Sequence, residues 1–400
     1  MSCRCPGSVF GALALALALA LALALALVLS GCASASDTAD ALPRPIGTHG
    51  SSDAVHPMSR PVSMHVPPDH PTQRGLEAVL AAAGMSAALD RLGVLAAADP
   101  TLADHQFAHL LGSAQYRRLG GDLDAAFRRC DVRFQGGRYH GTLQEHFRTL
   151  PAVDGTALRG LCDRLAAGQA PAIHANCAHG VGHGLYIHFD HEIAEPLRHC
   201  ELLVEAERIE CRGGVFMEHL VVNLTGHAHP ARPGQVAGFR PADPHYPCNS
   251  VDSVGRPSCY LYQGMAMLHL NGRDVAAAFS ACDGAAPADV PACYFGMGGA
   301  ISAITHPDVA RSDRYCRLGA AAYQAWCFQN LVEIQVNTAL STARAVEQCE
   351  AAPSWFAGRC VEVVADRVGW LWADRTDQAR ECGRFPDDGR AEQCRRLAVL

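Results

Sequence analysis

Residues 282–293 read Cys-Asp-Gly-Ala-Ala-Pro-Ala-Asp-Val-Pro-Ala-Cys, so ten residues separate two cysteines. The same spacing occurs in five successive pairs of this 400-residue chain, and a sixth pair has eleven residues between its members. The first cysteines of the last five pairs follow one another at steps of 34, 34, 33 and 33 residues. A fixed period in this range is typical of helical-hairpin repeats. The sequence therefore predicts an all-α fold, an array of antiparallel helical hairpins.

The disulfide pairing can be predicted from the distances between the cysteines. The segment after Cys293 is predicted to be helical, and about fifteen helical residues would hold Cys293 and Cys316 roughly 22 Å apart. A disulfide needs Cα atoms within about 7 Å. Each bond should therefore close the shorter gap, between a short helix ending at the first cysteine and a longer helix starting at the second. The expected disulfides are Cys162–Cys177, Cys200–Cys211, Cys248–Cys259, Cys282–Cys293, Cys316–Cys327, Cys349–Cys360 and Cys382–Cys394.

The N-terminus has the features of an export signal. Arg4 precedes an apolar run from Val9 to Leu29, which ends in Leu29-Ser30-Gly31-Cys32. This ending resembles the lipobox of bacterial lipoproteins, and the resemblance implies that residues 1–31 are a signal peptide and that Cys32 is lipidated. An uncleaved signal anchor is the alternative, because the run is long enough to span a bilayer. Either reading places the chain outside the cytoplasm on a membrane, and on the periplasmic side of the outer membrane if the cell is Gram-negative.

The rest of the chain divides by composition. Residues 32–72 are rich in Pro, Ser, Thr and Asp without an apolar period, which predicts a disordered tether. Residues 73–400 are expected to form one disulfide-rich helical repeat domain, with a His-rich half at 101–229, an insertion at 223–247 and a scaffold half at 248–400. The formal net charge is -7. Because there is no basic patch with interleaved aromatic residues, nucleic acid is excluded as a partner.

Histidines are concentrated in one half of the domain. Thirteen of the twenty lie between His105 and His229, and only three follow. Histidines that served the fold would be spread over all the repeats, as the cysteines are. Two pairs spaced four apart share a helix face, and neutral imidazole with carboxylate suits Zn, Fe, Cu or Ni. The predicted metal ligands are His105, His109, His140, His179 and His183, with Glu145 and Glu218 as ligands, orienting groups or bases. Histidines used without a metal, or packed as structural residues, remain open as alternatives.

Three motifs occur in the His-rich half: HxxxH at 105–109, ahead of the paired cysteines, and HGxGH at 179–183 and GVFME at 214–218, between them. Their combination resembles a family of bacterial exported lipoproteins, and more loosely the Sel1-like and TPR repeat arrays. The looser resemblance implies stacked antiparallel helices with a concave face, and it implies no chemistry. An α-solenoid and a closed α/α toroid are both compatible with the pattern.

Two functions follow as hypotheses. The first is a membrane-anchored protein with a His/Glu site, used for metal binding or metal-dependent chemistry. The second is a metal-free repeat scaffold that binds envelope proteins or peptides. Cys130 has no partner in the repeat and is either a buried free thiol, which we favour, or an intermolecular link. The insertion at 223–247 is either a lid or a plain surface excursion.

Overall fold

The computed structural model describes residues 70–99, 102–127, 132–225, 240 and 242–398, the side chains of 221–225 excepted. All of them belong to one compact unit, Val62–Leu400. Within these ranges the chain forms eighteen α-helices and three short 3-10 helices, and it forms no β-strand. The predicted all-α class is therefore confirmed. The predictions for Cys32, Cys130 and most of the insertion fall outside the described residues.

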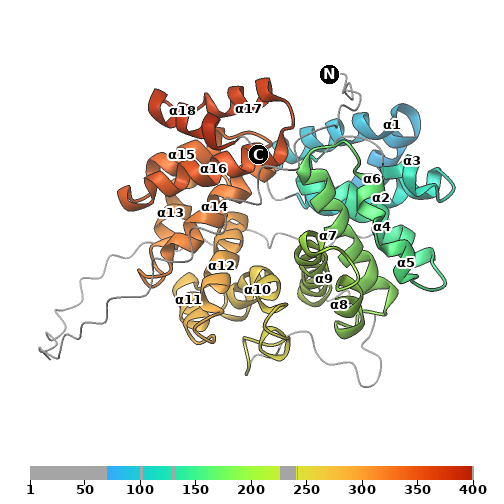
Figure 1. The fold of residues 1–400 in the computed structure, drawn as a ribbon, viewed down its shortest axis with the longest axis horizontal. Coiled ribbons are helices and arrows are strands. Elements are labelled where there is room, and N and C mark those ends of the chain that lie inside the picture. Colours follow the sequence, from blue (N-terminus) through green and yellow to red (C-terminus); the bar gives the residue numbers. More distant parts are fainter. Residues whose placement is uncertain (1–69, 100–101, 128–131, 226–239, 241, 399–400) are drawn as a thin grey trace, which may run out of the picture. The chain divides into compact units, whose positions relative to one another are not determined.

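The helices alternate between short and long ones, in the order of Figure 1. The first half contains α1 (Pro71–Ala98), α2 (Asp104–Arg118), α3 (Leu123–Phe127), η1 (Phe134–Gly136), α4 (Gly137–Thr149), α5 (Gly155–Leu158), α6 (Leu161–Leu165), α7 (Pro171–His188), α8 (Ala194–Cys200) and α9 (Glu205–Thr225). The second half contains η2 (Cys248–Ser250), α10 (Arg256–Leu270), α11 (Val275–Asp283), α12 (Val290–Thr305), α13 (Val309–Cys316), α14 (Gln324–Ala339), α15 (Ala343–Ala351), η3 (Ser354–Phe356), α16 (Ala357–Leu371), α17 (Arg375–Cys382) and α18 (Asp388–Leu397).

Seven disulfides join these helices, and they are the seven expected from the spacing. Their Cα atoms lie 5.5 to 5.7 Å apart. One detail differs from the prediction. The second cysteine lies inside its helix rather than at the start, because α12 begins at Val290 with Pro291 in its first turn, ahead of Cys293. Proline is preferred there since the first turn needs no backbone N–H donor.

The long helices pack on one another in chain order. Contacts run from α2 to α4, α7, α9, α10, α12, α14 and α16. The array then returns to its first half, because α16 also packs against α7 and α14 against η1. A hydrogen bond of 3.4 Å from Gln135 Nε2 to Thr338 Oγ1 joins the same two regions. Of the two predicted architectures, these contacts within the unit favour the closed one.

Glycines let the helices of the His-rich half approach closely. A Cβ atom on Gly141 of α4 would lie 1.8 Å from the carbonyl oxygen of His109 on α2. A Cβ on Gly214 of α9 would lie 1.9 Å from the carbonyl oxygen of His179 on α7. Only a residue without a side chain fits at such a contact. The backbones therefore touch at the level of the histidines, which brings the imidazoles of successive helices within reach of one another.

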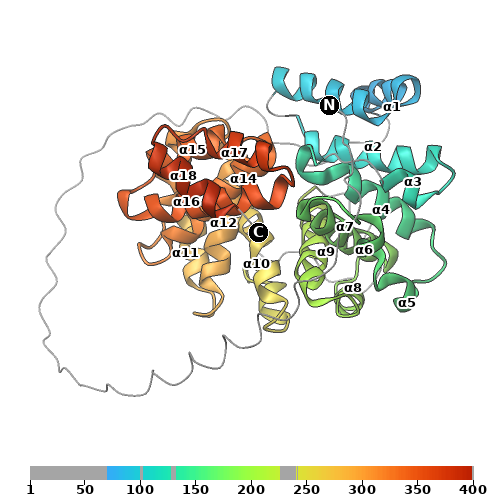
Figure 2. The same cartoon turned by 45° about the horizontal axis from the view of Figure 1, so that its top comes forward.

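Helix α1 is the one described helix that is long and apolar enough to cross a membrane. It is broken at Gly84, where φ is +84°. Leu76, Leu80 and Leu89 are buried in a cluster with Phe107 of α2. The segment thus forms two helical pieces that cover the first repeat, as Figure 2 shows for α1 above α2. The Ala- and Leu-rich composition of this segment is accounted for by that packing.

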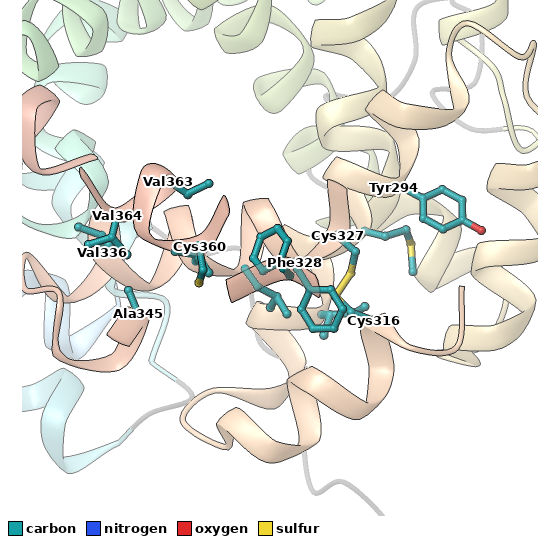
Figure 3. Packing of buried hydrophobic residues seen from close by; sticks show 14 of the residues in the cluster. Tyr294, Cys316, Cys327, Phe328, Val336, Ala345, Cys360, Val363 and Val364 are labelled. Atoms are coloured by element: carbon teal, nitrogen blue, oxygen red, sulfur yellow. A yellow bond between two sulfur atoms is a disulfide. The ribbon is translucent and has the colours of Figure 1, made fainter. Parts of the chain in front are cut away.

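The scaffold half has a continuous apolar core in which the disulfides take part. Phe328 and the Cys316–Cys327 bond are fully buried side by side, and Val336 and Val364 extend the same cluster toward α16 (Figure 3). A buried disulfide here both fills volume and restricts the unfolded chain. Residues of α14 and α16 from this half line the same cavity as His105 and His109.

Candidate metal centre

The five predicted histidine ligands come together. His105 and His109 project from α2, His140 from α4, and His179 and His183 from α7. Neighbouring imidazole rings in this cluster have centroids 4.6 to 5.5 Å apart. Four of the side chains are buried, and His105 is partly exposed. Within this cluster two groups of three histidines, His105/His109/His140 and His140/His179/His183, have ligand nitrogens within 4.8 Å of one another, close enough for a single ion.

Hydrogen bonds fix the tautomers of the two α2 histidines. His105 Nδ1 lies 2.7 Å from the backbone oxygen of Phe134, an acceptor, so Nδ1 carries the hydrogen. Gln144 donates its amide to Glu218 at 2.8 Å, which orients its oxygen toward His109 Nδ1 at 3.0 Å. His109 therefore also donates from Nδ1. In both rings Nε2 is left as a bare lone pair.

The same reasoning applies to α4 and α7. Asn176 donates its amide to the oxygen of Ala172 at 2.7 Å, so its own oxygen accepts from His140 Nε2 at 3.0 Å. The carboxylate of Glu218 accepts from His183 Nδ1 at 2.7 Å. The bare nitrogens are then His140 Nδ1 and His183 Nε2. This is the arrangement of metal-bound histidines, in which the outer N–H is donated and the inner nitrogen is presented.

The inner nitrogens converge. His109 Nε2 lies 3.0 Å from His105 Nε2 and 3.3 Å from His140 Nδ1. Lone pairs at such distances repel unless a cation lies between them. A tetrahedral zinc ion with bonds of about 2.0–2.1 Å holds its nitrogen ligands roughly 3.3–3.4 Å apart. His183 Nε2, which is buried without a hydrogen-bond partner, lies in the ring next to His109. The side chains present therefore fit a metal ion.

His179 lies at the edge of the cluster. Its Nε2 is 3.4 Å from the sulfur of Met217, and His140, His179 and His183 form a second group of closely spaced nitrogens. The rings of His140 and His183 are nearly parallel, at 23°. Ring nitrogens bind metals in the plane of the ring, so parallel rings do not converge on one point. His105, His109 and His140 are the better-placed set.

Four of the five imidazoles in the cluster have lowered pKa values and are neutral. Burial lowers the pKa of His105 to about 4, and it lowers the pKa values of His109, His140 and His179 well below the ordinary 6.5. Mutual repulsion between the imidazoles acts in the same direction, since a second positive charge in the cluster is disfavoured. The bare nitrogens of His105, His109 and His140 are therefore unprotonated at neutral pH, and a metal ion would not compete with protons for them.

The two predicted glutamates differ. Glu218 lies at the cluster through its bond to His183. Glu145 does not, because Arg117 and Arg148 both bind its Oε2, at 3.1 and 2.7 Å. We therefore correct the prediction for Glu145, which is an ion-pair residue and not a ligand, an orienting group or a base for the histidines.

The error came from the register of the repeat. His109 and Gln144 are 35 residues apart, as are His183 and Glu218. Gln144, and not Glu145, is thus the counterpart of Glu218, so the prediction of Glu145 was shifted by one residue. Adjacent residues on a helix point about 100° apart, so the shift moves a side chain off the site. The spacing of 35 was visible in the sequence, but without the structure nothing favoured it over 36.

Several other histidines have structural partners, as the alternative reading expected. His146 bonds to the hydroxyl of Tyr116 at 3.1 Å, His219 to that of Tyr186 at 3.0 Å, and His188 to a backbone oxygen. These contacts separate the histidines of the cluster from the packed ones. These three histidines were left out of the ligands predicted from the sequence, but no partners were predicted for them.

A cavity of about 480 Å³ adjoins the cluster. His105, His109 and His183 line one wall, and the opposite wall comes from α14 and α16. Two polar residues of this cavity, which the sequence analysis missed, are Glu210 and Glu333. Burial raises the pKa of both carboxyl groups and their mutual repulsion adds to the effect at Glu210, while Arg367 opposes it. Most of the remaining lining is apolar.

The chain matches no family model, no curated protein and no solved structure in the comparisons made. The site is therefore interpreted from its own geometry.

Proposed function

We propose that this chain is a metalloprotein whose histidine cluster binds one transition metal ion at the wall of the cavity. The observation that carries the proposal is that the imidazoles of His105, His109 and His140 each have one nitrogen held by a hydrogen bond and the other left bare. Their outer N–H groups are donated to fixed acceptors, while bare inner nitrogens of His105, His109 and His140 approach to 3.0 and 3.3 Å. A purely structural histidine gains nothing from facing another lone pair.

The donor set favours zinc. Three imidazoles with one open position describe a catalytic zinc site. Copper and iron also bind imidazole, and the thioether of Met217 near His179 is a ligand that Cu(I) prefers. Glu218 places one negative charge next to His183, which partly balances the ion.

The cavity supports metal-dependent chemistry on a small molecule. An ion held by His105 and His109 would face the cavity and take a ligand from it as a Lewis acid. Glu210 lines the same cavity beside His179 and has a raised pKa, so it is the carboxyl group placed to accept or deliver a proton there. Glu218 is already engaged with His183 and Gln144 and acts by orienting them.

We further propose that the protein works outside the cytoplasm, attached to a membrane through lipidated Cys32. Seven disulfides support an oxidising compartment. The lipobox-like Leu29-Ser30-Gly31-Cys32 and the apolar run before it support the anchor. The test is mass spectrometry of the mature N-terminus, which should begin at an acylated Cys32. An unmodified or uncleaved N-terminus would contradict the anchor.

Elemental analysis tests the metal. The full chain is purified without a His tag, beside His109→Ala/His140→Ala and a control, His146→Ala/His188→Ala, whose histidines lie on α4 and α7 and bond to Tyr116 and Phe147 outside the cluster. We expect wild type and control to carry one more ion per chain than the cluster variant, with equal helical circular dichroism. Equal metal contents in all three, after reconstitution with Zn, Cu or Fe, would refute the proposal. The scaffold hypothesis would then be tested by pull-down with envelope proteins.

A further inference from the structure

A second group of metal-ligating side chains lies away from the histidine cluster. Asp163 projects from α6, His174 from the first turns of α7, and Glu207 from the first turn of α9. One ligand atom from each lies within 4.8 Å of the others. The cluster histidines on α7 begin five residues later, at His179, so this group belongs to the beginning of the helix and not to the central site.

The two distances from His174 are compatible with a coordination sphere as well as with its hydrogen bond to Asp163. His174 Nε2 lies 3.1 Å from Asp163 Oδ1 and also 3.1 Å from Glu207 Oε1. A single N–H can point at only one of two acceptors. Three ligand atoms around a tetrahedral ion, in contrast, are all roughly 3.3 Å from one another.

Glu207 is the residue that makes the group unusual. Its side chain is 1% exposed, and neither carboxylate oxygen has a hydrogen bond of acceptable geometry. Burying an unpaired carboxylate is costly unless a charge or a metal ion compensates it. Its Oε1 faces His174. The carboxylates of Glu207 and Asp163 also raise the pKa of His174, which shows that the group attracts positive charge.

Access from solvent is graded across the group. The exposed fraction of the side chain falls from 68% at Asp163 to 33% at His174 and 1% at Glu207. An ion could therefore enter from the surface, keep water on its outer side and meet the buried carboxylate on its inner side.

We propose that Asp163, His174 and Glu207 form a second cation site that takes a divalent ion of the zinc type, completed by water. Two carboxylates and one neutral imidazole balance the charge of such an ion and are ligands that zinc accepts. Asp163 follows Cys162, and His174 precedes Cys177 by three residues, so the ion clamps the hairpin that the Cys162–Cys177 disulfide closes. It also joins that hairpin to α9 in the next repeat. The site is structural and independent of the central metal.

Zinc stoichiometry tests the proposal. The full chain is equilibrated with Zn²⁺ and dialysed, and bound zinc is counted for wild type, His174→Gln and the control His199→Gln. His199 is a partly buried histidine that bonds within its own helix, to the oxygen of Glu195. We expect His174→Gln to bind one zinc ion fewer than wild type, and His199→Gln to match wild type. Asp163→Asn should weaken the same ion about tenfold or more.

Thermal unfolding provides the second reading. Zinc should raise the midpoint temperature of unfolding of wild type and of the cluster variant His109→Ala/His140→Ala. In His174→Gln this temperature should rise less than in wild type, because the second site is lost. A loss on His174→Gln with no loss in the cluster variant would support this site and refute the central one. Equal zinc contents in His174→Gln and wild type would overturn the second site, whatever the central cluster binds.

Discussion

The side-chain oxygen of Gln144 accepts a hydrogen bond from Nδ1 of His109 at 3.0 Å, while its amide donates to Glu218 at 2.8 Å. Gln144 thus links the histidines of α2 to those of α7, because Glu218 in turn holds His183. It touches no inner nitrogen. If the cluster binds a metal, Gln144 orients its ligands from outside.

We predict that Gln144→Met lowers metal affinity about ten- to a hundredfold with little change in fold, since such outer partners typically contribute that much. Affinity is measured by competition with a chelator of known strength. The control is Gln115→Met, a partly exposed position on α2. Unchanged affinity in Gln144→Met would show that the bond to His109 does not prepare a ligand.

The glycine contacts predict a steric effect on the site. A methyl group at Gly141 or Gly214 would overlap a backbone oxygen of the neighbouring helix, so Gly141→Ala and Gly214→Ala should separate the helices. We expect a loss of about 1–3 kcal/mol in unfolding free energy, together with weaker metal binding.

Gly358→Ala is the control for these two variants, because a Cβ at this helical position in α16 meets nothing within 4 Å. It should be neutral or stabilise by up to about 1 kcal/mol, as alanine does in a helix. Thermal unfolding gives all three values. A Gly214→Ala protein as stable as Gly358→Ala would contradict the close approach of α7 and α9.

The repeats predict a contribution from each disulfide. Cys282→Ala/Cys293→Ala should lower the free energy of unfolding by about 2–4 kcal/mol, because the bond closes a loop of about twelve residues and both sulfurs are fully buried. Denaturant unfolding under oxidising conditions measures the difference. Helical circular dichroism should be retained at low temperature, since α11 and α12 keep their apolar contacts. An unchanged midpoint would indicate that packing alone holds this hairpin.

The cavity carboxyl of Glu333 predicts a pH effect. Its pKa is raised above the ordinary 4.5 by burial, so the folded state holds this proton more tightly than the unfolded state does. The associated stability is present below pH 4.5 and is lost as the pH rises through the raised pKa. Because glutamine resembles the protonated form, Glu333→Gln should match wild type near pH 4 and unfold at a higher temperature than wild type at pH 8.

Glu347→Gln at an exposed position of α15 is the control for that comparison, and its difference from wild type should not change between the two pH values. Midpoints of thermal unfolding at pH 4 and pH 8 measure both. A Glu333→Gln protein less stable than wild type at pH 8 would mean that Arg367 outweighs the effect of burial.

The sequence by itself determined the fold class and the disulfides. The spacing of two cysteines in the sequence limits the distance between their Cα atoms, because a helix rises by a fixed length per residue. Cys282 near the end of α11 and Cys293 in the first turns of α12 flank a short loop, and the bond closes that loop. The five histidine candidates were also readable, because the distribution of a residue type along a repeat reflects its use.

The tertiary structure decided what the histidines do. Which nitrogen is bare depends on partners up to 36 residues away, such as Asn176 for His140, and a repeat period does not fix a side-chain direction to within one residue. The exclusion of Glu145 and the choice of Gln144 depend on a rotation of about 100° per residue. The cavity wall at Glu333 and the contact of α16 with α7 arise only when the array closes. The spacing of residues along the sequence determines the helices and the disulfides, whereas the chemistry of the site depends on contacts between helices that are distant in the sequence.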